Sequence, residues 1–319
     1  MGFQSRSKFD AFDRIDLVYH VVHDHPLQAS ILTPKELSGQ SSKQLPVVVF
    51  WHGGGFIVGD RLYEPWWSEW LIEFALSQSV MIITADYRLM PEATGADILD
   101  DIEAFWNWLY DTLPLIADSW TAQPDLNRIL CVGQSSGGCM AVQSALLRPD
   151  MNIKAIVSMY APLHRAVPYF TVPQPRKIMG APPFPPRQAE AKIRSYIKSM
   201  PPEAVRTTGD PTDMWELLRC ILQQGWLPRL IDARPDARLD IFAMMEQTNV
   251  LPPIWFIHGE QDSVVPPICS TAFIEKMETV LPRVPVLFSK KAGEHAFEAT
   301  LTMKEPWIAE GCKFLMSFW

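Results

Sequence analysis

The segment RILCVGQSSGGCMAVQSALL, residues 128–147, constrains the fold more than any other part of the chain. An apolar run ends at Gly133, a tight turn carries Ser135, and a helical pattern follows at once. The G-x-S-x-G pattern requires this context, because small residues let the strand and the helix approach while the turn exposes the central hydroxyl. The helix N-terminus also favours developing negative charge. Ser135 is therefore predicted to be a nucleophile at the end of a buried strand.

The same four letters, GQSS, occur earlier at residues 39–42 in a different context. No helix follows that copy, and Lys43 stands where the second glycine should be. We interpret it as a solvated loop. Because the pattern is short, G-x-S-x-G alone would fit a structural turn about as well.

Short apolar runs alternate with helical patterns along most of the chain, which favours an α/β fold with a mostly parallel sheet flanked by helices. A leading hairpin is expected from the runs at 16–22 and 28–34. The further strands are expected at 45–51, 80–87, 128–133, 154–162, 253–259 and 284–289. The helices are expected at 68–78, 97–113, 268–280 and in a closing segment that runs to Trp319.

Residues 164–250 interrupt this alternation. They contain the proline-dense stretch VPYFTVPQPRKIMGAPPFPPRQ and helical patterns such as DMWELLRCILQQGW. Long insertions between strands are often lids or binding loops, so we expect a cap over the mouth of the sheet. A disordered linker is the alternative, but the Trp, Phe and Met content fits it poorly. The whole chain, 1–319, is expected to form a single domain.

Composition excludes several classes of protein. The net charge is −8 and the pI about 5.4, so the composition does not indicate a basic surface that would bind nucleic acid or an anionic membrane. No apolar run is long enough to span a bilayer. The first 20 residues have scattered charges and no continuous apolar stretch, so a secretory signal is not expected. The five cysteines are odd in number and scattered without metal-ligand spacing, which predicts a reduced, cytoplasmic protein. The triad chemistry proposed below is expected to need neither a metal nor an organic cofactor.

A glycine-rich loop, FWHGGGF at 50–56, follows an apolar strand. Three consecutive glycines free the backbone to turn its N–H groups toward one point, which is how an oxyanion hole is built. We predict that Gly54 and Gly55 donate to an oxyanion, together with the N–H of Ser136. A flexible turn is the alternative interpretation.

The C-terminal third supplies candidates for an acid and a base. Asp262, in WFIHGEQDSVVPP, falls in a loop just beyond a strand, where a carboxylate can orient an imidazole. Glu260 is the rival acid. His295, in AGEHAFEA, is the only histidine after Asp262, so the order Ser, Asp, His is satisfied. Of the other histidines, His164 is a candidate to line the pocket. The remaining five are expected to be structural: His20, His23, His25, His52 and His258.

These residues resemble the hormone-sensitive-lipase-like group of the α/β-hydrolase superfamily. The resemblance rests on HGGGF, DYRLMPE at 86–92, GQSSGG and the late acid and histidine. It implies an eight-stranded α/β-hydrolase fold with a helical cap built from the insertion, to which residues 1–15 are a candidate addition. It also implies that Asp86 and Arg88 brace the loops behind the oxyanion hole.

The sequence departs from that group in two places. The elbow of the group usually reads G-D-S-A-G-G, whereas Gln134 and Ser136 stand here, so the electrostatics beside the nucleophile and the substrate preference differ. The acid loop, HGEQDSVVP, is closer to the H-G-x-x-D-x-x-V-P form of peptidase-like and formamidase-like relatives.

The sequence thus predicts a serine carboxylester hydrolase that works through Ser135, His295, Asp262 and an acyl-enzyme. Aromatic residues, prolines and methionines in the insertion favour an apolar or aromatic ester, unless they only form the core of the cap. One alternative is a thioester or lactone hydrolase, or an acyl transferase, that releases or tailors a polyketide-type secondary metabolite. A second is a non-catalytic small-molecule receptor on the same fold. The expected partner is a small-molecule ester or thioester, and the protein is expected to be a monomer or a homodimer.

Overall fold

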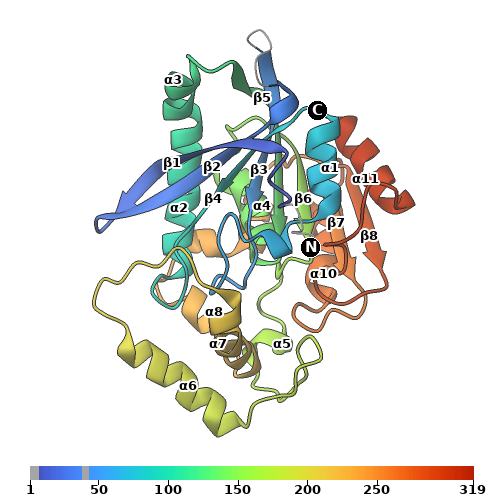
Figure 1. Cartoon of the computed structure of the whole chain (residues 1–319). Helices are drawn as coiled ribbons and strands as arrows, with labels where there is room; N and C mark the ends of the chain where they lie inside the picture. The colour runs from blue at the N-terminus through green and yellow to red at the C-terminus, as the bar shows by residue number, and fades with distance from the viewer. Residues whose placement is uncertain (1–6, 38–42) are drawn as a thin grey trace, which may run out of the picture.

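The computed structural model describes residues 7–37 and 43–319, so the first GQSS copy lies outside the described residues. Eight strands form one sheet in the order β1-β2-β4-β3-β5-β6-β7-β8 (Figure 1). The strands are β1 Phe12–Val22, β2 His25–Pro34, β3 Lys43–Trp51, β4 Met81–Ala85, β5 Ala122–Gln134, β6 Ile153–Met159, β7 Ile254–Gly259 and β8 Val286–Lys291. Only β2 runs antiparallel to its neighbours, and this confirms the mostly parallel, eight-stranded α/β sheet.

The helices connect and cover these strands. They are α1 Glu69–Ser77, α2 Gly95–Asn107, α3 Leu113–Ala117, α4 Ser136–Leu147, α5 Pro168–Thr171, α6 Pro186–Ser199, α7 Pro211–Gln223, α8 Leu227–Ile231, α9 Ile241–Gln247, α10 Ile268–Val280 and α11 Pro306–Met316. Shorter turns are the 3-10 segments η1 Lys35–Leu37, η2 Glu64–Trp66 and η4 Ala237–Leu239, and the π-helical turn η3 Trp108–Thr112.

The central strands of the sheet are buried on both faces. Val47 and Val49 of β3 pack in one apolar cluster with residues of α2 and α4, whereas Val48 and Phe50 pack in the opposite cluster with residues of α1 and α11. Successive side chains of a strand point to opposite faces, so a strand covered on both sides needs the continuous apolar run that β3 has. The parallel arrangement brings the C-terminal ends of β3, β5, β6 and β7 to one edge of the sheet.

Several elements differ from their predicted limits, and in two of them the structure shows why. The helix predicted at 97–113 begins earlier, because Thr94 caps it and forms a capping box with Asp97. It ends at Asn107 and passes through η3 into α3, whose Pro114 lacks the backbone N–H of a regular helix. Strand β5 begins six residues before the predicted start at 128, because its polar first residues pair with the start of β3 ahead of a register shift.

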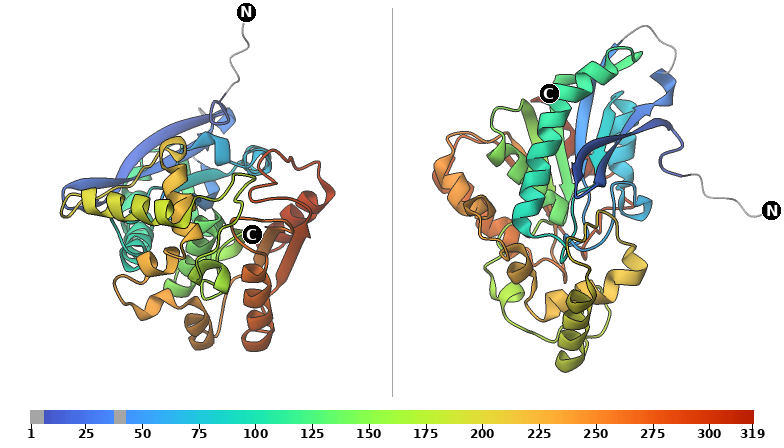
Figure 2. Two further views of the ribbon diagram at one scale, coloured as in Figure 1. Left: turned by 90° about the horizontal axis from the view of Figure 1, so that it is seen from below. Right: turned by 90° about the vertical axis from the view of Figure 1, so that its left-hand side faces the viewer.

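The segment between β6 and β7 carries α5 to α9 and lies beyond the edge where the parallel strands end (Figure 2). We call residues 160–253 the β6–β7 insertion. At the other end of the chain, Trp319 stacks on Phe74 of α1 with ring centroids 5.6 Å apart, so the apolar C-terminus packs on the body. No helix in the described part of the chain is long and apolar enough to cross a membrane.

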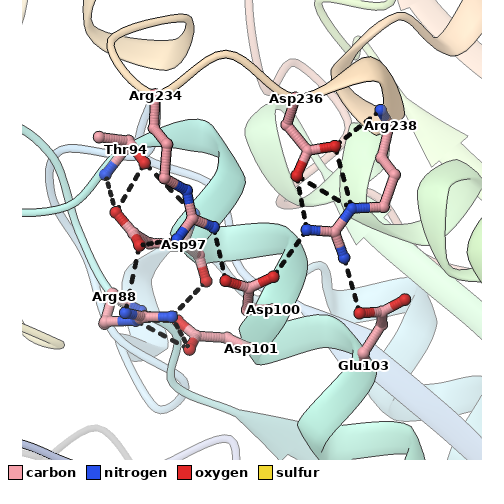
Figure 3. A network of polar contacts seen from close by, with 9 residues as sticks. All are labelled: Arg88, Thr94, Asp97, Asp100, Asp101, Glu103, Arg234, Asp236 and Arg238. Carbon is pink, nitrogen blue, oxygen red and sulfur yellow. Dashed lines mark hydrogen bonds and ion pairs between the residues drawn. The ribbon is translucent and has the colours of Figure 1, made fainter.

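Ion pairs tie the last part of the insertion to α2 (Figure 3). Arg238 reaches Asp100 and Glu103, each at 2.7 Å, and also pairs with Asp236. Arg234 pairs with Asp100 at 2.5 Å. Several charges that share partners in this way hold position better than an isolated surface pair.

Candidate functional site

Ser135 occupies the turn between β5 and α4. Its backbone has φ 52° and ψ −121°, a conformation that costs energy for a residue with a side chain and is typical of functional turns. The N–H of Ser135 donates to the carbonyl of Met159 at 2.8 Å, which holds the turn against the end of β6. Gly137 permits this geometry, because a Cβ there would lie 2.1 Å from the carbonyl oxygen of Trp51.

His295 joins Ser135 to Asp262. Its Nε2 lies 3.0 Å from the Ser135 Oγ, and its Nδ1 lies 2.7 Å from the Asp262 Oδ2. A carboxylate at Nδ1 fixes the tautomer that has its lone pair on Nε2, so Nε2 can accept the serine proton. The three residues come from loops after β5, β7 and β8, and the structure brings them together at the common edge of the sheet.

Asp262 is held in its charged form by its surroundings. Its side chain is fully buried, and burial alone would raise its pKa. The positive charge available on His295 and hydrogen bonds from His258, His295 and the N–H of Val265 outweigh burial and hold the pKa well below the usual range. Its Oδ1 accepts from the N–H groups of Val264 and Val265 at 2.8 Å. Asp262 is therefore a fixed anion.

The glycine loop after β3 lies beside Ser135. Gly54 has φ 108°, and a Cβ there would lie 1.9 Å from the carbonyl oxygen of Val58, so only glycine fits. The N–H groups of Gly54, Gly55 and Ser136 have no acceptor among the described residues. Gly54 and Gly55 line the same cavity as Ser135, and Ser136 begins α4. These N–H groups are therefore free to donate, and their role as an oxyanion hole stays a prediction.

Two arginine–aspartate pairs involve the segment just after β4. Asp86 accepts from the N–H of Arg61 at 2.9 Å and forms an ion pair with the same guanidinium. Arg88 reaches Asp101 of α2 at 2.8 Å and also contacts Asp97 (Figure 3). Asp86 thus links the segment after β4 to Arg61, and Arg88 links it to α2, whereas their bracing of the oxyanion hole stays a prediction.

A cavity of about 390 Å³ opens next to Ser135. The sheet-edge loops and the β6–β7 insertion contribute its walls. They comprise Gly53, Gly54, Gly55, Trp66, Gln134, Ser135, Tyr160, Pro162, Phe170, Met179, Pro211, Thr212, Trp215, Leu218, Leu222, Leu227, Val264, Val265, His295 and Ala296. None of these lining residues is Asp, Glu, Lys or Arg. Such a cavity suits an uncharged, apolar group.

Hydrogen bonds attach the β6–β7 insertion to the glycine loop and the residues that follow it. The guanidinium of Arg206 donates to the carbonyl oxygens of Ile57 and Met90, at 2.7 and 2.6 Å. Gly209 exchanges two backbone hydrogen bonds with Gly59, at 2.7 and 3.1 Å. The cavity wall from the insertion is therefore fixed relative to the candidate oxyanion hole.

The other candidates from the sequence fall elsewhere. Glu260 is exposed, two residues from Asp262, and its N–H donates to the carbonyl of Lys291. His164 packs against Phe242 and lines a separate open hollow. Among the described residues, no group of three or more His, Cys, Asp or Glu side chains could hold a metal ion.

Three polar residues of the site are not predicted from the sequence: Tyr160, Glu294 and Glu298. Glu294 accepts from the N–H groups of Ser263 and His295 and so joins the acid loop to the histidine loop. Glu298 is completely buried and accepts a hydrogen bond from the hydroxyl of Tyr160. Only the position of Glu294 next to His295 offers a local signal, because the other contacts join distant parts of the chain.

Comparison with known proteins places the chain in a family. A family model described as the alpha/beta hydrolase fold matches residues 48–207. A protein of a Phoma species named probable carboxylesterase M8 is 58% identical over 321 residues, which span all of both chains. Probable carboxylesterase clz11 of Cochliobolus lunatus is 62% identical over 189 residues, 59% of this chain and 86% of that one. The chain belongs to the α/β hydrolases, within the hormone-sensitive-lipase-like group expected from its sequence.

Solved structures agree on the fold. An esterase from Pyrobaculum calidifontis superposes with a TM-score of 0.60 at 19% identity, over 96% of this chain and 86% of that one. Esterase B from Lactobacillus rhamnosis superposes with a TM-score of 0.61 at 17% identity, over 97% of this chain and 85% of that one.

Proposed function

We propose that this protein is a serine hydrolase that cleaves carboxylic esters through an acyl-enzyme on Ser135. One observation carries the proposal: His295 contacts Ser135 at 3.0 Å and Asp262 at 2.7 Å, at the wall of an apolar cavity. The names of the Phoma and Cochliobolus relatives support the same reaction class.

The chemistry follows from these contacts. His295 Nε2 takes the proton of Ser135 as Oγ forms a bond to the ester carbonyl carbon, and Asp262 stabilises the imidazolium. The carbonyl π electrons move to its oxygen, which receives hydrogen bonds from Gly54, Gly55 and Ser136. When the intermediate collapses, the C–O bond to the alcohol breaks and the imidazolium protonates the leaving oxygen. Water then repeats the sequence, with His295 as base, and releases the acid and free Ser135.

The cavity supports a neutral substrate with an apolar or aromatic group. Its lining includes four aromatic residues and several aliphatic ones; the aromatic residues are Trp66, Tyr160, Phe170 and Trp215. An ionised group would lose its hydration there without meeting an opposite charge, which is costly. The β6–β7 insertion, expected as a cap at 164–250, is proposed to act as one within a single domain.

Other reactions of an acyl-enzyme are alternative outcomes of the kinetic test described below. Thioesters, lactones and acyl transfer to an alcohol or thiol all use the same triad, and a polyketide-type metabolite is one source of such groups. A cytoplasmic location is part of the proposal, and five buried cysteines without disulfide partners support it.

Steady-state kinetics on neutral and anionic aryl esters test the proposal. We expect 4-nitrophenyl butyrate and 4-nitrophenyl benzoate to be hydrolysed. The kcat/KM for 4-nitrophenyl hemisuccinate should be at least about 100-fold lower than for the butyrate, because its carboxylate would be buried without an opposite charge. Ser135→Ala should lose about 10⁴-fold or more in kcat. Full activity in that variant would refute the proposal, and a preference for acyl thioesters or lactones would reassign the substrate.

A matched pair of acid variants tests the role of Asp262. Asp262→Asn should lower kcat by about 10³–10⁴-fold, because an amide does not stabilise the imidazolium and favours the wrong tautomer. Glu260→Gln changes an exposed carboxylate two residues away and should leave kcat within about twofold of the wild type. Equal effects of the two variants would contradict the assignment.

A further inference from the structure

Tyr160 is a strained residue between the elbow and the histidine loop. It follows β6 directly and has φ 38°, which is unfavourable for an aromatic residue. Its N–H donates to the carbonyl of Ile257 at 2.6 Å, and the preceding residue, Met159, accepts from Ser135. Strain of this kind persists only where the surroundings enforce it, and it concentrates at functional sites.

The ring of Tyr160 contacts the imidazole of His295. The two ring centroids are 4.5 Å apart at an interplanar angle of 65°, an edge-on contact. Tyr160 is 2% exposed and lines the cavity beside His295. The phenol ring therefore limits rotation of the imidazole and keeps water from that side of it.

The hydroxyl of Tyr160 is anchored by a buried acid. It donates to Glu298 Oε1 at 3.1 Å, and the hydroxyl of Ser68 reaches the same oxygen at 2.9 Å. Glu298 is fully buried, and its Oε2 has no partner among the described residues. Burial raises the pKa of Glu298. A buried carboxyl with one oxygen unsatisfied is expensive, so it requires a role that offsets its cost.

A chain of hydrogen bonds connects this acid to the nucleophile turn. The amide Nε2 of Gln134 donates to Ser68 Oγ at 2.9 Å. Because the Ser68 hydroxyl has one proton, it accepts from Gln134 and donates to Glu298. The polar chain thus runs from the residue before Ser135, through Ser68 and Glu298, to the tyrosine on His295.

We propose that Tyr160 and Glu298 are a positioning pair for His295, an inference that rests on the proposed role of His295 as the general base. Glu298 fixes the tyrosine hydroxyl, and the tyrosine ring holds the imidazole in line with Ser135. Misorientation of the base weakens proton transfer in the transition state more than it weakens substrate binding, so the effect belongs in kcat. A purely structural hydrogen bond would lower the melting temperature without changing kcat per active site.

Variants that remove the hydrogen bond between Tyr160 and Glu298 test whether this pair positions His295. Tyr160→Phe keeps the ring but removes the hydroxyl, and Glu298→Leu removes the acceptor. Each should lower kcat by about tenfold with KM within about twofold, because small displacements of catalytic groups are costly. Glu298→Gln keeps an acceptor oxygen and should restore kcat to within about threefold of the wild type. The Tyr160→Phe/Glu298→Leu double variant should lose no more than about tenfold, because both changes break one interaction.

The control is Tyr110→Phe, which removes a hydroxyl that bonds to the carbonyl of Leu126 far from the triad. Active sites are counted by titration with a phosphonate, so unfolded protein does not affect kcat. An unchanged kcat in Tyr160→Phe and Glu298→Leu, with only a lower melting temperature, would overturn the inference. So would fold-changes that multiply in the double variant. A wild type that neither hydrolyses esters nor takes up the phosphonate would refute the proposed function, and the inference with it.

Discussion

His52 is a neutral imidazole buried at the start of the glycine loop. Its ring stacks on Tyr87 with centroids 4.3 Å apart, and its Nδ1 donates to the carbonyl of Gly53 at 2.8 Å. Burial lowers the pKa of His52 from 6.5 to about 4, against a smaller opposing effect of the Gly53 carbonyl. The folded protein therefore takes up no proton at this site until the solution is well below neutral pH.

This lowered pKa makes stability depend on pH in a defined direction. Between about pH 6.5 and pH 4 the unfolded chain binds a proton at His52 that the folded chain does not, so acidification favours unfolding. We expect the stability advantage of the wild type over His52→Gln to shrink by about 2–3 kcal/mol between about pH 7.5 and about pH 4.5. Urea unfolding of both proteins at the two pH values measures this change. A constant difference would contradict it.

Gln134 explains one departure from the usual elbow sequence. Its Nε2 donates to the carbonyl of Trp66 at 2.7 Å and to Ser68 Oγ at 2.9 Å. An ionised aspartate could donate to neither. An amide is therefore the side chain that this polar chain requires.

The sequence predicts some residues of the site better than others. Ser135, Asp262 and His295 follow strands in a fixed order, so local patterns are enough to select them, and the structure joins them by hydrogen bonds. The partners of Glu298 are different, because Tyr160 and Ser68 are 138 and 230 residues away in the chain. No local sequence pattern predicts such contacts. They depend on packing that only the complete fold specifies.

At the scale of elements, the β6–β7 insertion is fastened at two places. Arg206 and Gly209 attach it to the glycine loop, and Arg234 and Arg238 attach its last part to α2. The proline-dense composition of the insertion predicts a separate covering segment but not these anchors. The ion pairs join these two arginines to acidic residues of α2 (Figure 3).

Removal of one anchor should have a measurable, salt-dependent cost. Arg238→Met keeps the apolar stem but loses the contacts to Asp100, Glu103 and Asp236. We expect it to lower the free energy of unfolding by about 1 kcal/mol in low salt, because the arginine is partly exposed and its charges are screened. The loss should shrink in about 1 M NaCl, where the Debye length falls to about 3 Å.

The control for this experiment is Arg128→Met. Arg128 is more exposed and pairs with Asp125 of the same strand, so its removal should change stability by less than about 0.5 kcal/mol. Denaturant unfolding at two salt concentrations compares the two variants. An equal loss in both, or a loss for Arg238→Met that does not respond to salt, would show that the network does not anchor the insertion.

At the scale of the whole molecule, the sheet brings distant loops to one place. Strands β3, β5, β7 and β8 are parallel neighbours or near neighbours, so the loops after them meet at one edge. Alternating runs in the sequence predict this architecture, because strands buried on both faces must be continuously apolar. The exact limits of β5 and α2 were not predictable, because a register shift and a proline-linked π-turn set them.

The most direct test of the central claim is intact-mass spectrometry after reaction with a fluorophosphonate. The wild type and Ser41→Ala, the matching position in the first GQSS copy, should each gain one phosphonyl group. Ser135→Ala should gain none, because an activated serine is the only expected target. Labelling of Ser135→Ala at the wild-type level would contradict the account. So would a wild type that stays unlabelled even with the smallest probes, an outcome expected of a receptor that binds without reacting.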